Sequence, residues 1–444
     1  MHLRKIILLL LMILVLLTSS FAFAEGDYEE GSGWKYQNGV LTITANGGFE
    51  AYFKEVDDYD RAKKYQNEPY QIDCIVIGKN VTQFSMFAFG TDFYPSQMIV
   101  EEGNPNFSVV DGWLVNVKTK TLICATDLYH FQWMSSARNI PDSVQYIGEN
   151  AFYPLNNIQQ ICLPDNIIAI EDNAFESCEA LQTIELPSNV KKIGRSAFNY
   201  CHSLKKVSLD TSVDTIGEYA FYSCYNLVTI NLEDTQITEL NSNALSMAGI
   251  KSIVLPDTLQ AIKSYAFELC WFLETITVCS DNIVIFDGAF SKCDALKTII
   301  FTKGVPKWIG SRLFDETGKT ADGKSFISSS YEAEGKVIPY PTLYYTAAYA
   351  DEWAPNGETV WNGYPIDELS QDELNAILAE ARGEPVPTPT ATAAATASPA
   401  ATQAVVAAIF RTPFIVLLLA GLIALAIAAI VVVGVLRRHK QIKR

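Results

Sequence analysis

The sequence predicts a solenoid of stacked repeats, each of about 23 residues and each supplying one β-strand and one short helical or 3₁₀ turn. The first observation is a periodic aromatic position: Phe152, Phe175, Phe198 and Phe221 follow one another at intervals of 23 residues. The second is an L-x-x-I-x-L stretch in each unit, whose last two apolar positions alternate as in a strand with one buried face. The third is that so short a unit cannot bury its own apolar face, so neighbouring units must stack around one core.

The repeated positions separate a framework from a surface. We assign the periodic aromatic residue, and the cysteine three residues after it, to the buried framework, because a cysteine in such a column is typical of a small buried hydrophobe. The framework comprises Phe152, Phe175, Phe198, Phe221, Phe267, Phe290, Cys178, Cys201, Cys224, Cys270 and Cys293. One unit departs from the pattern: Asn243 to Gly249 reads NALSMAG, with spacings of 24 and then 22 residues around it, and predicts a local distortion.

The strand of each repeat has two positions that flank its central apolar residue and are predicted to point outward. These positions are mostly small or polar and favour β-structure. The candidate strand-face contacts are Thr183, Glu185, Lys206, Ser208, Thr229, Asn231, Thr275 and Thr277. Such a face suits a broad protein surface better than a deep small-molecule pocket.

Aromatic residues also gather beside the cysteine column, on the turn edge of neighbouring units. They are Tyr200, His202, Tyr222, Tyr225, Trp271 and Phe272. Exposed rings of this kind stack on sugars or anchor a protein partner, so this cluster is the candidate ligand-contact patch. The alternative is that half of the rings pack against the next coil.

The two ends of the chain predict export and anchoring. Residues 1–24 read as a signal peptide, since Arg4 and Lys5 precede a twelve-residue apolar core and the segment ends in Ala-Phe-Ala. Residues 414–436 are 23 residues without a charge, enough to span a hydrocarbon core of about 30 Å as a transmembrane helix. The basic tail, residues 437–444, places the C-terminus in the cytoplasm by the positive-inside rule.

A helix and a stalk are predicted between the solenoid and this span. Residues 369–384 carry an S-x-x-E capping box at Ser370 and Glu373 and an apolar stripe that includes Leu374 and Ile377. We expect this short helix to pack on the end of the ectodomain. Residues 385–413 form a Pro/Thr/Ala-rich stalk without apolar periodicity.

Charge and residue usage argue against several functions. The chain has a net charge of -17, and all eight basic residues outside residues 25–404 lie at the ends, so the middle carries 25 minus 50, or -25. This sign argues against nucleic acid as a partner. His130 and His202 are the two histidines of residues 25–404, so a histidine-based nucleophile or metal site has little support.

No catalytic residue, cofactor or metal is therefore assigned, and we expect a protein that is not an enzyme. The string from Gly318 to Ser325 matches a phosphate-binding loop, but it lacks the buried strand and the helix that such a loop needs. Acid pairs for glycoside hydrolysis stay open, because 50 carboxylates offer many chance pairs.

The units GRSAFNYCHSLKKVSL and GEYAFYSCYNLVTINL closely resemble the BspA-like leucine-rich-repeat surface proteins of bacteria and some parasitic protists. The resemblance covers roughly residues 33–365 and implies a leucine-rich-repeat solenoid over residues 71–314. It also implies a small β-rich N-terminal cap at 25–70, a hairpin insertion at about 104–140, and a loop with a closing segment at 315–368. Members of this family are described as adhesins or ligand-binding surface proteins.

These observations together predict a single-pass cell-membrane protein whose ectodomain lies outside the cell and binds an extracellular protein or glycan without catalysis. One alternative is a structural surface module with weak self-association. A less favoured alternative is a surface hydrolase built on the repeats.

Overall fold

The structure, a computed structural model, describes residues 28–46, 72–85, 95–127, 139–153, 155–310, 313–314, 341–382 and 384–385. The predicted signal peptide, transmembrane helix and basic tail lie outside these residues, as do residues 386–413 of the predicted stalk and the string from Gly318 to Ser325. None of the helices in the described residues has the length and apolar composition that a membrane crossing requires.

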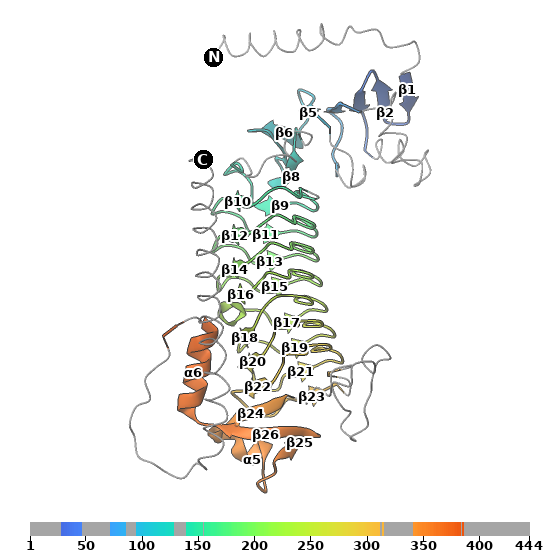
Figure 1. Ribbon diagram of the computed structural model, residues 1–444. Helices are drawn as coiled ribbons and strands as arrows, with labels where there is room; N and C mark the ends of the chain where they lie inside the picture. The colour runs from blue at the N-terminus through green and yellow to red at the C-terminus, as the bar shows by residue number, and fades with distance from the viewer. Residues whose placement is uncertain are drawn as a thin grey trace, which may run out of the picture. The chain divides into compact units, whose positions relative to one another are not determined.

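The repeats form coils whose strands pair in parallel and in register. One sheet has the order β10-β12-β14-β16, and its strands are Gln160–Cys162, Thr183–Glu185, Lys206–Ser208 and Thr229–Ile230. Thr183 lies opposite Gln160 on one side and Lys206 on the other, so equivalent residues of successive repeats form a column. Figure 1 shows these coils stacked one upon the next.

A second row of shorter parallel strands runs beside the first. In its first half, β9 (Tyr146–Ile147), β11 (Ala169–Ile170), β13 (Lys192–Ile193) and β15 (Thr215–Ile216) pair in that order. In its second half the order is β17 (Glu239–Leu240), β19 (Ala261–Ile262), β21 (Val284–Ile285) and β23 (Trp308–Ile309). A typical coil thus contributes one strand to each row and one long turn that carries the periodic aromatic residue.

The core between these rows is a stack of phenylalanine rings. All eleven framework residues are buried, each with 3% or less of its surface exposed. The Phe198 ring lies 5.2 Å from that of Phe175 and 5.3 Å from that of Phe221, each pair inclined by 2°. A fixed 23-residue period produces a stack with one ring per coil, because every coil places its equivalent residue at the equivalent position.

The turn that carries the aromatic residue is not the helical or 3₁₀ turn that the sequence predicts. It is a run of β-turns, with hydrogen bonds such as Ala197 N to Gly194 O (3.3 Å) and Cys201 N to Phe198 O (3.2 Å). Two residues per coil have left-handed backbone conformations, for example Ser196 (φ 52°) and Tyr200 (φ 59°). A left-handed residue ends a helical run, so the turn cannot continue as a helix.

The strand row is interrupted once. After β16 the chain forms a 3₁₀ helix, η2 (Leu232–Asp234), and pairing resumes in a second sheet of order β18-β20-β22-β24-β26-β25. These strands are Ser252–Leu255, Thr275–Val278, Thr298–Phe301, Thr342–Thr346, Tyr364–Leu369 and Val360–Trp361. The predicted distortion at Asn243–Gly249 is a shortened turn: Leu245 and Ala248 are buried in the positions of the framework Phe and Cys, but Gly249 alone follows Ala248, where other coils have two residues before the next buried apolar position. The additional residue of the 24-residue spacing is accommodated upstream, at η2.

Further strands lie at both ends of the described chain. Strands β1 to β5 form one sheet in chain order, with bounds Tyr28–Gly31, Trp34–Gln37, Val40–Ile43, Cys74–Ile77 and Gln97–Val100. Strands β6 (Phe107–Val110), β7 (Trp113–Asn116) and β8 (Thr121–Ala125) pair antiparallel, and β8 pairs in parallel with β9. Near the other end, β24 leads into η3 (Ala347–Tyr349) and the short helix α5 (Ala350–Trp353).

Helix α6 (Gln371–Arg382) begins with the predicted capping box. Ser370 N donates to Glu373 Oε2 over 2.9 Å, and Glu373 N donates to Ser370 Oγ over 3.3 Å. The sequence predicts that this helix packs on the end of the ectodomain, whereas the structure places it on the strand face beside β18 (Figure 1). Its Leu374 packs in a buried cluster with Ile300 and Leu369, because outward strand positions in this half are apolar.

Candidate binding surfaces

The six residues of the predicted contact patch, which we call the ring ladder (Tyr200, His202, Tyr222, Tyr225, Trp271 and Phe272), include five whose rings form a continuous row. The Tyr200 ring makes edge-to-face contacts with the rings of Tyr222 and His202. The ring centroids are 5.7 Å and 5.9 Å apart, and both pairs of rings are nearly perpendicular. The His202 and Tyr225 rings stack at 5.0 Å and 18°. Tyr225 in turn stacks with Trp271 at 6.3 Å and 22°. Five of the six predicted residues are thus linked by ring contacts.

The contact between Tyr225 and Trp271 crosses a coil that lacks a ring. In that coil the residue after the framework position is Gly249, and a Cβ there would lie close against the Tyr225 carbonyl oxygen. Because Gly249 has no side chain, the Tyr225 and Trp271 rings on either side of this coil can approach each other. The interruption that the Leu245 unit makes in the sequence pattern therefore does not interrupt the ring ladder.

The ring ladder keeps substantial solvent contact. Tyr200 and Tyr225 are each 40% exposed, Trp271 is 42% exposed and Phe272 is 55% exposed. Tyr222 is half-buried. This burial is the main cause that raises the pKa of its phenol, and the neighbouring Tyr200 and Tyr225 raise it further. Packing against the next coil therefore accounts for only part of the ring surface.

Two tyrosines at this edge have left-handed backbone conformations. Tyr200 (φ 59°) and Tyr219 (φ 57°) occupy left-handed positions that other coils fill with residues such as Ser177 and Asn173. Such a conformation costs a bulky residue on the order of 1 kcal/mol, and Met247, Tyr265 and Leu269 adopt it at the equivalent positions of other coils. Tyr219 was not assigned from the sequence, and its ring lies 5.6 Å from that of Tyr222. Its place in the same position as Asn173 and Ser196 was the available signal.

The predicted strand-face residues are exposed in the first half of the solenoid. Thr183, Glu185, Lys206, Ser208 and Thr229 are all exposed on β12, β14 and β16, with Glu185 opposite Ser208. They form a shallow polar surface that is separate in position from the long turns carrying the ring ladder.

The second half of the strand face differs from the prediction. Thr277 is buried, with 1% of its surface exposed, and Val254 and Ile300 in the same column are also buried. Thr275 is half-buried. The sequence pattern treated every strand alike, whereas α6 covers this half.

Asn231 also departs from its predicted role. Its amide accepts a hydrogen bond from Leu209 N (2.8 Å) and donates one to Leu209 O (2.9 Å), so it replaces the missing strand pairing next to η2. A side chain committed to two backbone groups is poorly placed to contact a ligand.

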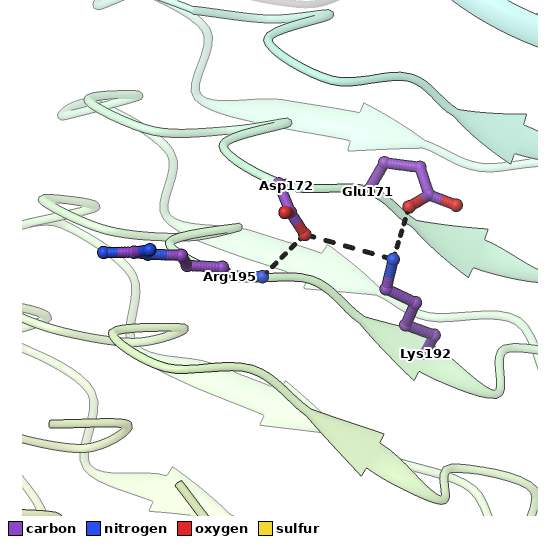
Figure 2. A network of polar contacts seen from close by, with 4 residues as sticks. All are labelled: Glu171, Asp172, Lys192 and Arg195. Atoms are coloured by element: carbon purple, nitrogen blue, oxygen red, sulfur yellow. Dashed lines mark hydrogen bonds and ion pairs between the residues drawn. The ribbon is translucent and has the colours of Figure 1, made fainter. Parts of the chain in front are cut away.

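Charged residues on the second strand row tie successive coils together. Lys192 Nζ lies 2.6 Å from Glu171 Oε2 and 4.0 Å from Asp172 Oδ1, and Asp172 Oδ1 accepts a hydrogen bond from Arg195 N at 2.9 Å (Figure 2). The bond to Glu171 raises the pKa of the Lys192 ammonium. Because each contact joins a coil to the next one, the network has a structural role.

The cysteine column is polar as well as buried. All nine cysteines lie in the described residues and are free thiols. Each framework thiol donates to a carbonyl oxygen of the preceding coil, as Cys201 Sγ does to Phe175 O (3.2 Å) and Cys293 Sγ to Phe267 O (2.9 Å). Burial raises the pKa of Cys178, Cys201, Cys224 and Cys293, which disfavours the nucleophilic thiolate.

Across the described residues, no group of three or more His, Cys, Asp and Glu side chains is placed to hold a metal ion. Burial raises the pKa of the Glu176 carboxyl, which also accepts a hydrogen bond from Asn199 over 2.9 Å in the next coil. That bond gives Glu176 a structural partner.

Parallel coils, in-register columns and a stacked apolar core define the leucine-rich-repeat solenoid as the class of this fold. Residues 127–247 and 192–321 match the model of the BspA type leucine rich repeat region, in six copies. The repeat region of the chain therefore belongs to the BspA-type leucine-rich-repeat family.

Several solved structures are similar. The pneumococcal vaccine antigen PcpA is 17% identical, with a TM-score of 0.37, over 53% of this chain and 56% of that one. A leucine-rich repeat protein from Eubacterium ventriosum is 20% identical, with a TM-score of 0.37, over 55% and 58% of the two chains. A leucine rich cell surface protein from Faecalibacterium prausnitzii is 18% identical, with a TM-score of 0.36, over 66% and 75%. The chain spans less than two thirds of the first two structures. The comparison with curated proteins gave no significant match.

Proposed function

We propose that this protein is a cell-surface leucine-rich-repeat protein, anchored in the membrane by residues 414–436, that binds protein or glycan ligands without catalysis. The observation that carries the proposal is the ring ladder, in which centroid distances of 5.0 to 6.3 Å link Tyr222, Tyr200, His202, Tyr225 and Trp271 in a row. Exposed, clustered aromatic side chains supply large contact area with little loss of side-chain entropy on binding.

The proposed topology rests on the sequence of the two ends. A signal peptide at 1–24 exports the chain, and the apolar span with its basic tail at 437–444 holds it with the ectodomain outside. The stalk at 385–413 separates the solenoid from the membrane, and the β-rich segment at 25–70 caps its N-terminal end.

The proposed absence of catalysis is supported by the roles of the polar groups near the ladder. Glu176 is bonded to Asn199, and the framework thiols are bonded to carbonyl oxygens. Binding at an exposed ridge of rings requires no activated nucleophile or acid-base pair.

Cells that display the full chain provide the test. Extracellular matrix proteins and glycans would be screened for capture by cells carrying the native chain and by cells carrying a Tyr222→Ala, Tyr225→Ala, Trp271→Ala variant. The matched control is Lys206→Ala with Thr229→Ala, which removes two exposed side chains from the strand face. We expect captured ligand to be lost only with the ring variant. Unchanged capture by a ring variant that reaches the surface folded would contradict the proposal, and loss with the control alone would move binding to the strand face.

A further inference from the structure

We propose that the ring ladder recognises a basic protein segment, one that presents arginine or lysine side chains, in preference to a neutral glycan. The inference rests on the proposed function, since it names the partner class of the same surface. Four observations lead to it.

Stacking covers ring faces of three ladder residues. His202, Tyr225 and Trp271 lie within 22° of parallel and face one another across the coils. A sugar ring stacks on a broad open face, whereas this arrangement mainly presents ring edges and the two end faces of the stack. The open surfaces are therefore narrow ones, which suit a side chain that inserts beside a ring.

Carboxylates stand at both ends of this stack. The position after the framework cysteine runs Glu179, His202, Tyr225, Gly249, Trp271 and Asp294 in successive coils. Adjacent coils are about 4.8 Å apart where their strands pair, so Glu179 lies one coil before His202 and Asp294 lies one coil after Trp271 in the column. Glu179 is exposed and Asp294 is half-buried. A cation at either end would contact a ring face and a carboxylate together, the combination that favours ammonium and guanidinium groups.

The protein already contains one such contact within its own chain. Arg195 Cζ lies 5.9 Å from the centroid of the Tyr219 ring, and Tyr219 contacts Tyr222 of the ring ladder. The rings at this edge therefore accept a guanidinium group in the folded protein. An incoming arginine would repeat the contact on rings that remain exposed, such as Trp271 and Phe272.

The charge of the whole ectodomain acts in the same direction. Residues 25–404 carry 25 basic and 50 acidic residues. A net charge of this size attracts cationic partners and repels anionic ones at distances up to the Debye length, about 8 Å at physiological salt.

The test uses the full chain purified in a non-ionic detergent and three probes: an Arg-Gly repeat peptide, a Glu-Gly repeat peptide of the same length, and a panel of neutral hexasaccharides. Binding would be measured by titration for the native chain, for Tyr225→Ala with Trp271→Ala, for Glu179→Gln, and for the strand-face control Lys206→Ala with Thr229→Ala. Thermal unfolding would confirm that each variant is folded.

We expect the Arg-Gly peptide to bind, and its Kd to rise by at least about tenfold in the ring variant and several-fold in Glu179→Gln and in high salt, with the strand-face control unchanged. The Glu-Gly peptide should not bind. Arg-Gly binding that is indifferent to both the ring variant and Glu179→Gln would overturn the inference. Hexasaccharide binding that depends on the rings, without ring-dependent Arg-Gly binding, would overturn it too but would leave the proposed binding function intact. If the ring variant does not fold, the Kd of the Arg-Gly peptide for Glu179→Gln still tests the inference.

Discussion

Arg382, in the last turn of α6, donates from Nε to Glu233 Oε1 over 2.9 Å and so joins the helix to the break in the strand sheet. The two ends of α6 are held by different forces. Leu374 at one end is packed against buried apolar side chains, whereas the Arg382 end lies over a cavity of about 440 Å³ whose lining includes Ser252 and Val254. The Arg382 side chain is 41% exposed, so its ion pair with Glu233 is partly screened by solvent.

Docking of α6 should therefore depend on its apolar contacts more than on its ion pair. We expect Leu374→Ala to weaken docking by about 2 to 4 kcal/mol, because it removes a buried side chain. Arg382→Ala should weaken docking by less than about 1 kcal/mol, as exposed ion pairs do. Hydrogen exchange of the α6 amides measures both effects. Equal acceleration of exchange in the two variants would refute this ranking.

The buried thiols should make stability fall in alkaline solution. Burial raises the pKa of Cys201 well above the ordinary value of 9.0, so the folded state retains a proton that the unfolded state releases. Its contribution is fully present below about pH 9 and is lost as pH rises toward the folded-state pKa, with a slope of about 1.4 kcal/mol per pH unit. Denaturant unfolding of the native chain and of Cys201→Ala between pH 8 and pH 10.5 would show a shallower decline in the variant. The same slope in both proteins would count against the assignment.

Thiol labelling should separate the cysteines by position. Cys162 is exposed on β10, whereas the framework cysteines are buried. We expect an aromatic disulfide reagent to label Cys162 rapidly in the folded protein and the framework thiols only as the protein unfolds. Peptide mapping after labelling identifies the modified residues, and rapid labelling of Cys201 under native conditions would disagree with the described core.

The phenylalanine stack predicts a graded cost of substitution. Phe198 is fully buried between two parallel rings, so Phe198→Ala should lower the free energy of unfolding by about 3 to 5 kcal/mol. Phe198→Leu should cost less than about half of that, because Leu245 fills the same column in another coil with 1% exposure. Denaturant unfolding of both variants checks the order, and a leucine variant as unstable as the alanine variant would be inconsistent with the column.

The repeat, its core and its register could be predicted because they depend on residues that recur. Phe152 to Phe290 recur with one period, and a period alone fixes which residues become neighbours in a stack. The ring ladder followed from the same logic, since Tyr200, Tyr222 and Tyr225 sit at fixed offsets from this framework.

The covered half of the strand face could not be predicted in this way. Thr277 belongs to the same column as Glu185, and its burial depends on a helix about a hundred residues further along the chain. The sequence pattern of one repeat does not indicate where an amphipathic helix from another part of the chain will pack. The turn conformation was missed for a different reason. Glycine in a sequence indicates a left-handed backbone, whereas Ser196 and Tyr200, which adopt that conformation here, do not.

The central claim, that rings are kept at this edge for contact with a partner, is tested most directly by replacing one strained tyrosine in the ring ladder and one outside it. Tyr200 and Tyr265 both have left-handed backbones (φ 59° and 62°) and similar exposure, 40% and 43%. Tyr200 contacts two ladder rings, whereas Tyr265 packs over Gly288. Asparagine tolerates the left-handed conformation, so relief of about 1 kcal/mol of strain offsets the lost ring contacts.

The decisive measurement is ligand capture by full-length Tyr200→Asn and Tyr265→Asn, with the unfolding free energy of each recorded alongside. We predict that both variants stay within about 1 kcal/mol of the native stability and that only Tyr200→Asn loses capture, by about fivefold or more. Equal capture by the two variants would contradict the claim that the ring ladder binds the partner.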